Sequence, residues 1–231
     1  MNRDYITEAA PGAKKQRRIH KIHNTYITLL NPLPKHIDIE ASIAGLKALP
    51  SWMFDLIDGI YIGKAQFFDD KHVEATYIDG SIYVTSELEH VFDLANNILH
   101  ELAHAAEARY RNELYSDGSI EEEFLKKRKH VFQLLNDYNI ETMSFDFWNN
   151  TEYNEKFDNH LMNELTYERI DSIAEGVLSY PYAITDIHEY FATAFEIWFN
   201  ESPKKASQFH PVVAKKIEEL FIMKGENHNV S

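Results

Sequence analysis

The hydrophobic pattern of residues 73–111 changes its period once, and this change limits the possible folds more than any other feature of the sequence. The segment VEATYIDGSIYVTSE alternates apolar and polar residues on both sides of Asp79-Gly80, a dipeptide typical of the type I′ turn of a β-hairpin. A long helix is expected to follow, from about Val91 to Arg111. The sequence therefore predicts a hairpin followed directly by a long helix.

The rest of the chain is mostly helical in pattern. A strand is expected in GIYIGKAQFF, ahead of the hairpin, and Ser119 with Glu122 has the spacing of a capping box at the start of another helix. Further helices are expected at 39–49, 51–59, 119–136, 185–200 and from about residue 211. The predicted fold class is α+β, with a small mixed sheet whose hairpin packs on the long helix, followed by a mostly α-helical C-terminal lobe.

The length of 231 residues fits one domain with two lobes. Residues 1–24 are expected to form a flexible basic arm, because KKQRRIHKIH concentrates positive charge there. Residues 25–231 are expected to form the single domain. It would have an N-lobe at about 25–111, an insertion at about 112–175 and a C-lobe at about 176–231.

Charge and cysteine content exclude several classes of protein. Thirty-seven acidic residues against 23 Lys and Arg give a formal net charge of −14, which argues against a nucleic-acid partner. The chain has no cysteine, so a metal would have to be held by His, Glu or Asp. No signal peptide or membrane-spanning run is visible. The protein is expected to be cytoplasmic as written, or secreted if a leader was removed, and its oligomeric state stays open.

The long helix carries His100, Glu101 and His104, the pattern H-E-x-x-H. Residues i and i+4 share a helix face, so both imidazoles can bind one ion, while Glu101 can reach a water molecule bound to it. With this composition, about 6% of shuffled chains would contain the pattern by chance, and the alternative is two satisfied histidines of the core. Small apolar residues flank the motif, and buried bare histidines would need partners. This context favours Zn²⁺.

A catalytic zinc site needs a third protein ligand. A metzincin would continue with glycine and histidine where this chain has Glu107 and Tyr110, so that class is excluded. A glutamate from a later helix remains. The candidates are Glu164, Glu168, Glu175, Glu189 and Glu196.

The segment YPYAITDIHEYFATAFEIWF resembles the second zinc helix of the anthrax lethal factor catalytic-domain family, which includes the secreted Pro-Pro endopeptidases of Gram-positive bacteria. Tyr182 stands seven residues before Glu189, and EYFATAF follows. The resemblance covers roughly residues 26–225. It implies a zincin-like metalloprotease fold, Glu189 as third zinc ligand, and Tyr182 as the phenol that hydrogen-bonds the developing oxyanion.

The chain departs from the pattern of this family in two ways. Thr193 occupies the position of a glutamate that normally orients a zinc histidine, and Glu107 is the candidate to replace that glutamate. The distance of 85 residues from His104 to Glu189 is long for the family. The extra length falls between Arg111 and Glu175 and is expected to form a wall or lid of the cleft.

These features together predict a zinc metalloendopeptidase of the gluzincin type, acting on a narrow set of protein substrates. The substrate peptide is expected to add as an extra β-strand to the hairpin strand GSIYVTSE. Two alternatives stay open. One is an intracellular regulatory protease that cleaves a repressor-like protein, and the other is a zinc-stabilised or degenerate binding protein without turnover.

Overall fold

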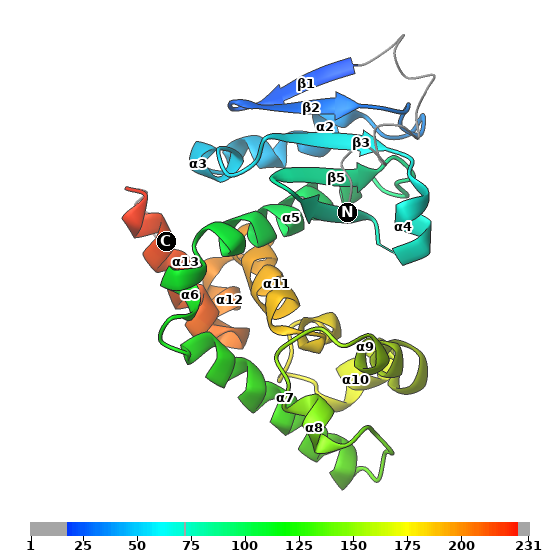
Figure 1. Ribbon diagram of the computed structural model, residues 1–231, viewed down its shortest axis with the longest axis vertical. Coiled ribbons are helices and arrows are strands. Elements are labelled where there is room, and N and C mark those ends of the chain that lie inside the picture. Colours follow the sequence, from blue (N-terminus) through cyan, green and yellow to red (C-terminus); the bar gives the residue numbers. More distant parts are fainter. Residues whose placement is uncertain (1–17, 72, 226–231) are drawn as a thin grey trace. The chain divides into compact units, whose positions relative to one another are not determined.

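The computed structural model of the protein describes residues 18–71 and 73–225 (Figure 1). The chain divides into two compact units, Met1–Arg109 and Tyr110–Ser231. Most of the expected basic arm, residues 1–17, lies outside the described residues. Residues 18–22, which also fell within that arm, form a strand instead.

Unit 1 is built on a five-stranded mixed sheet with the order β1-β2-β3-β5-β4 (Figure 1). The outer pairs β1–β2 and β4–β5 are antiparallel, whereas β2–β3 and β3–β5 are parallel. The strands are β1 (Arg18–Ile22), β2 (Thr25–Leu29), β3 (Gly59–Gly63), β4 (Ala75–Ile78) and β5 (Ser81–Thr85). The basic segment RIHKI forms a strand because the chain turns tightly at His23, whose φ is 49°, and so pairs β1 with β2.

The predicted hairpin is present as β4 and β5. Asp79 and Gly80 both have positive φ, 48° and 78°, as the type I′ turn requires. A Cβ at Gly80 would also come within 3.3 Å of the Asp58 carboxylate. The helix α5 (Asp93–Arg109) follows and packs against both strands, burying Ile98 and Leu102. The prediction of a hairpin packed on the long helix is thus confirmed.

Strand β5 is an interior strand. It pairs with β3 on one side and with β4 on the other, and all five of its residues are buried. The expectation that a peptide adds to GSIYVTSE is therefore wrong, because both backbone edges of β5 already take part in the sheet. Among the described residues, the open edge of the hairpin belongs to β4.

Three shorter elements of unit 1 differ in part from the pattern. The helix expected at 39–49 divides into α2 (Ile39–Ile43) and the 3₁₀-helix η2 (Gly45–Ala48), because glycine weakens the helix at residue 45. Helix α3 (Ser51–Phe54) lies where a short helix was expected. Strand β3 ends at Gly63, since the Asn31 side chain accepts the hydrogen bond of the Lys64 amide at 2.9 Å. The residues that follow form α4 (Gln66–Lys71).

Every regular element described in unit 2 is helical, so the α+β class with a helical C-terminal part is confirmed. The elements are α6 (Arg111–Tyr115), α7 (Ser119–Asp137), α8 (Phe145–Trp148), α9 (Glu155–Asn159), the π-helix η3 (His160–Leu165), α10 (Tyr167–Ile173), the 3₁₀-helix η4 (Pro181–Ile184), α11 (Ile187–Asn200), α12 (Pro203–Phe209) and α13 (Pro211–Met223). The capping box is absent: Gly118 is the N-cap of α7, and the hydroxyl of Ser119 donates to Asp117 instead.

Two aromatic side chains of the expected insertion, residues 112–175, are packed into the core of unit 2. Trp148 and Phe157 are fully buried against Val131 and Leu135 of α7, with ring centroids of the two aromatics 5.0 Å apart. These contacts bury apolar surface that α7 alone could not cover. Within the part of the chain that the structure describes, no helix is both long and apolar enough to span a membrane.

Candidate metal centre

Helix α5 places His100 and His104 one turn apart on the same face. Their Nε2 atoms are 3.1 Å apart, and their rings meet edge to face. Two nitrogen ligands of a tetrahedral zinc ion, each about 2.05 Å from the metal, lie about 3.3 Å apart. The spacing of the two nitrogens thus already fits a shared ion.

The other nitrogen of His104 faces a carboxylate on the same helix. Its Nδ1 lies 3.6 Å from Oε2 of Glu107, which is only 5% exposed. A carboxylate on this side favours the tautomer with the proton on Nδ1 and leaves the Nε2 lone pair directed at His100. Glu107 is therefore the carboxylate beside the ring nitrogen of His104 that faces away from His100.

Glu101 follows His100 on α5 and is 6% exposed. Successive residues are separated by about 100° around a helix, so this side chain leaves the helix beside the pair of imidazoles. Burial of a carboxylate in a helix that packs on a sheet is costly unless it has a function or a partner.

Glu189 lies in the first turn of α11. Asp186 is the N-cap of this helix, and its Oδ1 accepts hydrogen bonds from the amides of His188 at 2.8 Å and of Glu189 at 3.0 Å. Burial, followed by repulsion from Glu189, raises the pKa of Asp186. The N-cap therefore fixes the backbone from which the Glu189 side chain leaves the helix.

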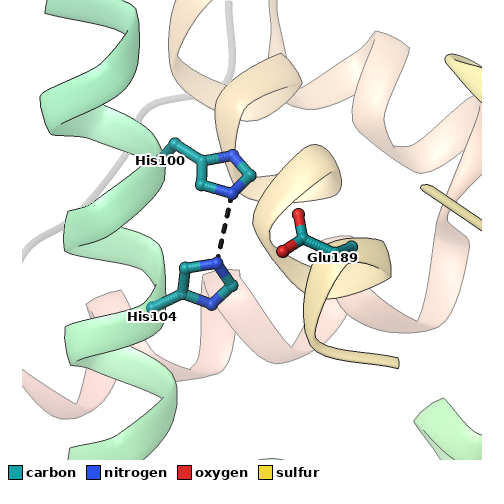
Figure 2. A group of neighbouring side chains, drawn as sticks. All are labelled: His100, His104 and Glu189. Atoms are coloured by element: carbon teal, nitrogen blue, oxygen red, sulfur yellow. Dashed lines mark hydrogen bonds between the residues drawn. The ribbon is translucent and has the colours of Figure 1, made fainter. Parts of the chain in front are cut away.

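Among the described residues, one group of three side chains could hold a metal: His100, His104 and Glu189 (Figure 2). Each offers one ligand atom, and these atoms all lie within 4.8 Å of one another. Two imidazoles and one carboxylate are the ligand set of a catalytic zinc site that keeps its fourth position for water. Of the candidate glutamates, Glu164 instead lies 2.9 Å from Nδ1 of His160.

Tyr182 lies in η4 and is 41% exposed. Partial burial of its phenol raises the pKa above the usual value, and the charge of Glu189 is the second cause. Its ring also packs edge-on against Tyr167, with centroids 5.9 Å apart. Tyr182 is therefore a neutral hydrogen-bond donor in the neighbourhood of Glu189.

Sequence reasoning missed the residues that support Tyr182 and Glu189. The hydroxyl of Tyr167 donates to Asp158 at 3.2 Å, and Tyr153 donates to the other oxygen of the same carboxylate at 3.1 Å. No sequence pattern links these residues to Tyr182 or Glu189. Asp186 could have been found, because D-x-x-E before an apolar run has the spacing of a capping box. Thr193 is buried on α11, one turn after Glu189.

Comparison of the chain with protein-family models, with curated proteins and with solved structures found no match.

Proposed function

We propose that the protein is a zinc-dependent endopeptidase of the gluzincin class, with a zincin-like fold, related to the lethal factor catalytic-domain family. His100, His104 and Glu189 would hold the zinc ion. One observation carries the proposal: these two imidazoles and one carboxylate have ligand atoms within 4.8 Å of one another. The mixed sheet with α5 packed on its hairpin supports the proposed fold.

A bound zinc ion would act as a Lewis acid on a water molecule and on the scissile carbonyl group. Glu101 is the general base, which accepts a proton from the attacking water and delivers it to the leaving amine nitrogen. The phenol of Tyr182 donates a hydrogen bond to the carbonyl oxygen as negative charge develops there. The carboxylate of Glu107, 3.6 Å from Nδ1 of His104, favours a proton on Nδ1 and so keeps the Nε2 lone pair free for the metal.

The substrate peptide adds to the open edge of β4. In a hairpin with a two-residue turn, the pair next to the turn exchanges both hydrogen bonds. Ile78 pairs with Ser81 and Thr76 with Tyr83, so their backbone groups face β5, whereas those of Ala75 and Tyr77 face outward. A peptide can use these outward groups. The start of β4 is tied to the motif helix, because Asn97 of α5 donates to Glu74 at 3.0 Å.

Metal content and cleavage test the assignment of ligands and base separately. Elemental analysis of the wild type, Glu189→Ala and Glu101→Gln is combined with digestion of a peptide library. One zinc ion per chain is expected in the wild type and in Glu101→Gln, with loss of zinc in Glu189→Ala and cleavage by the wild type alone. Glu168→Ala is the matched control, since this glutamate lies exposed on α10.

Each departure from this pattern has a distinct meaning. Full zinc content in Glu189→Ala would reject Glu189 as a ligand. Zinc in a wild type that cleaves no peptide would favour the binding protein without turnover. Retained cleavage in Glu101→Gln would reject Glu101 as the base.

The mode of peptide binding has its own test. Ala75→Pro removes an outward amide without breaking the β4–β5 ladder, because proline is tolerated on the open side of an edge strand. An increase in KM of about tenfold at unchanged thermal stability is expected. Thr76→Pro is the control, which removes a ladder hydrogen bond and should lower stability. An unchanged KM in Ala75→Pro would exclude strand addition at β4.

A further inference from the structure

Unit 2 contains a pocket that is built entirely from the insertion. Its volume is about 690 Å³, within the range of small-molecule sites. Three segments line it: the loop 139–143 after α7, the α9–η3 helical segment, and Arg169 of α10. None of the residues proposed to bind zinc, peptide or protons takes part.

Three lining residues, Thr142, His160 and Glu164, are linked by hydrogen bonds around the buried His160. Its Nδ1 lies 2.9 Å from Oε2 of Glu164, and its Nε2 lies 3.1 Å from the hydroxyl of Thr142. Trp148 donates to the same hydroxyl at 3.2 Å. The network is consistent if His160 donates through Nδ1 and accepts from Thr142 through Nε2. Both ring nitrogens of His160 therefore have a partner within the protein and need no ligand.

The backbone around the pocket departs from regular structure at two points. Residues His160–Leu165 form a π-helix, which is rare and occurs frequently at functional sites. Thr166 follows with φ 61° and ψ 140°, a conformation that a β-branched residue rarely adopts. Such strain persists where the surrounding structure holds it, and it concentrates at binding sites.

The distribution of charge indicates the class of ligand. Residues 137–175 contain ten acidic residues and only two basic ones, Lys156 and Arg169. Both basic residues line this pocket, although many carboxylates are available elsewhere in the segment. Neither side chain makes a hydrogen bond or ion pair with any described residue. Two cations left unpaired in an acidic segment are available to an external anion.

The remaining lining residues agree with this assignment. Asn139 and Asn159 add amide donors, and the half-buried Ile140 and Met143 supply apolar surface for a carbon skeleton. Two carboxylates also line the pocket: Glu164 is engaged by His160, and Glu141 is exposed on the loop. Hydrogen-bond donors thus predominate among the groups open to a ligand.

We propose that this pocket binds an organic anion, a molecule with a carboxylate or phosphate group on an apolar body, through Lys156 and Arg169. The guanidinium of Arg169 offers paired donors that match either oxyanion, and Lys156 adds a second positive charge. The site is independent of the proposed metal centre, so it stands even if the protein binds no zinc.

Titration of the isotope-labelled full chain followed by NMR tests the proposal. The four probes contain six carbon atoms each and differ in the head group: hexanoate, hexyl phosphate, hexan-1-ol and hexylamine. Hexanoate or hexyl phosphate is expected to shift the amide signals of the pocket residues with a dissociation constant of about 1 mM. Hexan-1-ol and hexylamine should bind at least about tenfold more weakly. The tighter of the two anions identifies the head group.

The double variant Lys156→Met/Arg169→Met is expected to lose at least about tenfold in anion affinity. Lys129→Met/Arg111→Met is the matched control, because it makes the same change in net charge at exposed residues outside the pocket. The control should stay within about twofold of the wild type. An equal loss of anion affinity in both double variants would show that the effect comes from net charge alone and would overturn the proposal. The proposal would also be overturned if hexan-1-ol bound as tightly as the anions or if hexylamine bound more tightly. Absence of binding of either anion at about 10 mM would overturn it too.

Discussion

The most specific prediction for unit 2 concerns the acid sensitivity of His210. This residue is fully buried, its Nε2 lies 2.6 Å from the hydroxyl of Ser179, and its ring packs on Tyr190. The hydroxyl of Tyr190 in turn donates a hydrogen bond to Glu123 of α7. Burial, and then the positive charge of Lys127, lower the pKa of His210 to about 3.

The lowered pKa gives the sign of the effect. In the unfolded chain the imidazole takes up a proton near its ordinary pKa of 6.5, whereas the native state resists protonation down to about pH 3. Between these values the unfolded state binds more protons, so the free energy of unfolding falls as the pH falls. Each pKa unit corresponds to 1.36 kcal/mol, and the loss from His210 is therefore about 3 kcal/mol by pH 4.

Other groups also titrate in this range, so the assay compares matched variants. Urea unfolding is followed by tryptophan fluorescence in a Trp52→Phe background, in which both remaining tryptophans, Trp148 and Trp198, report on unit 2. His210→Gln keeps an acceptor for Ser179 and removes the titration. The difference in unfolding free energy between the wild type and this variant should shrink by about 3 kcal/mol from pH 7 to pH 4.

The exposed His130 of α7 provides the control. His130→Gln should leave the difference from the wild type constant over the same range. A constant difference in His210→Gln as well would refute the idea that His210 is held neutral by burial.

Four further predictions follow from single contacts. Trp148→Ala should lower the free energy of unfolding by about 3–5 kcal/mol in urea titrations, because this side chain is fully buried in the unit 2 core. Asp186→Ala should cost about 1 kcal/mol by the same measurement, and Asp186→Asn much less, since asparagine caps a helix equally well. Gly80→Ala should lower the thermal midpoint by an amount equivalent to about 1 kcal/mol, because alanine is strained at φ 78°. Glu107→Gln should weaken zinc binding by about 10–100-fold in chelator competition, whereas Thr193→Val should change it less than about twofold.

The elements that a short sequence pattern determines could be predicted from the sequence. Asp79-Gly80 specified both the turn and the register of the hairpin, because few other dipeptides accept positive φ at two successive positions. The following helix was predicted to within two residues at each end. The spacing of His100 and His104 in turn fixed their common face.

Other features depend on contacts between distant residues, and these were missed or misassigned. The order of strands placed β4 outside β5, which alternation alone could not reveal. The capping box at Ser119 failed because Asp117 competes for its hydroxyl. No element was predicted between residues 137 and 184, yet Trp148 and Phe157 of this segment form a core with residues of α7 that precede them. The assignment of Glu189 came from a resemblance, since five glutamates had been equally acceptable from the motif alone.

The open edge of β4 has a consequence beyond substrate binding. An unpaired strand edge is a template for any extended backbone, including that of another copy of the same chain. The four residues Ala75–Ile78 contain no charge and no proline to oppose such pairing. Only the strand's short length and the acidic residues at its two ends, Glu74 and Asp79, limit it. Concentrated solutions should therefore begin to aggregate at this strand, and a lysine in place of Tyr77 should raise the solubility limit.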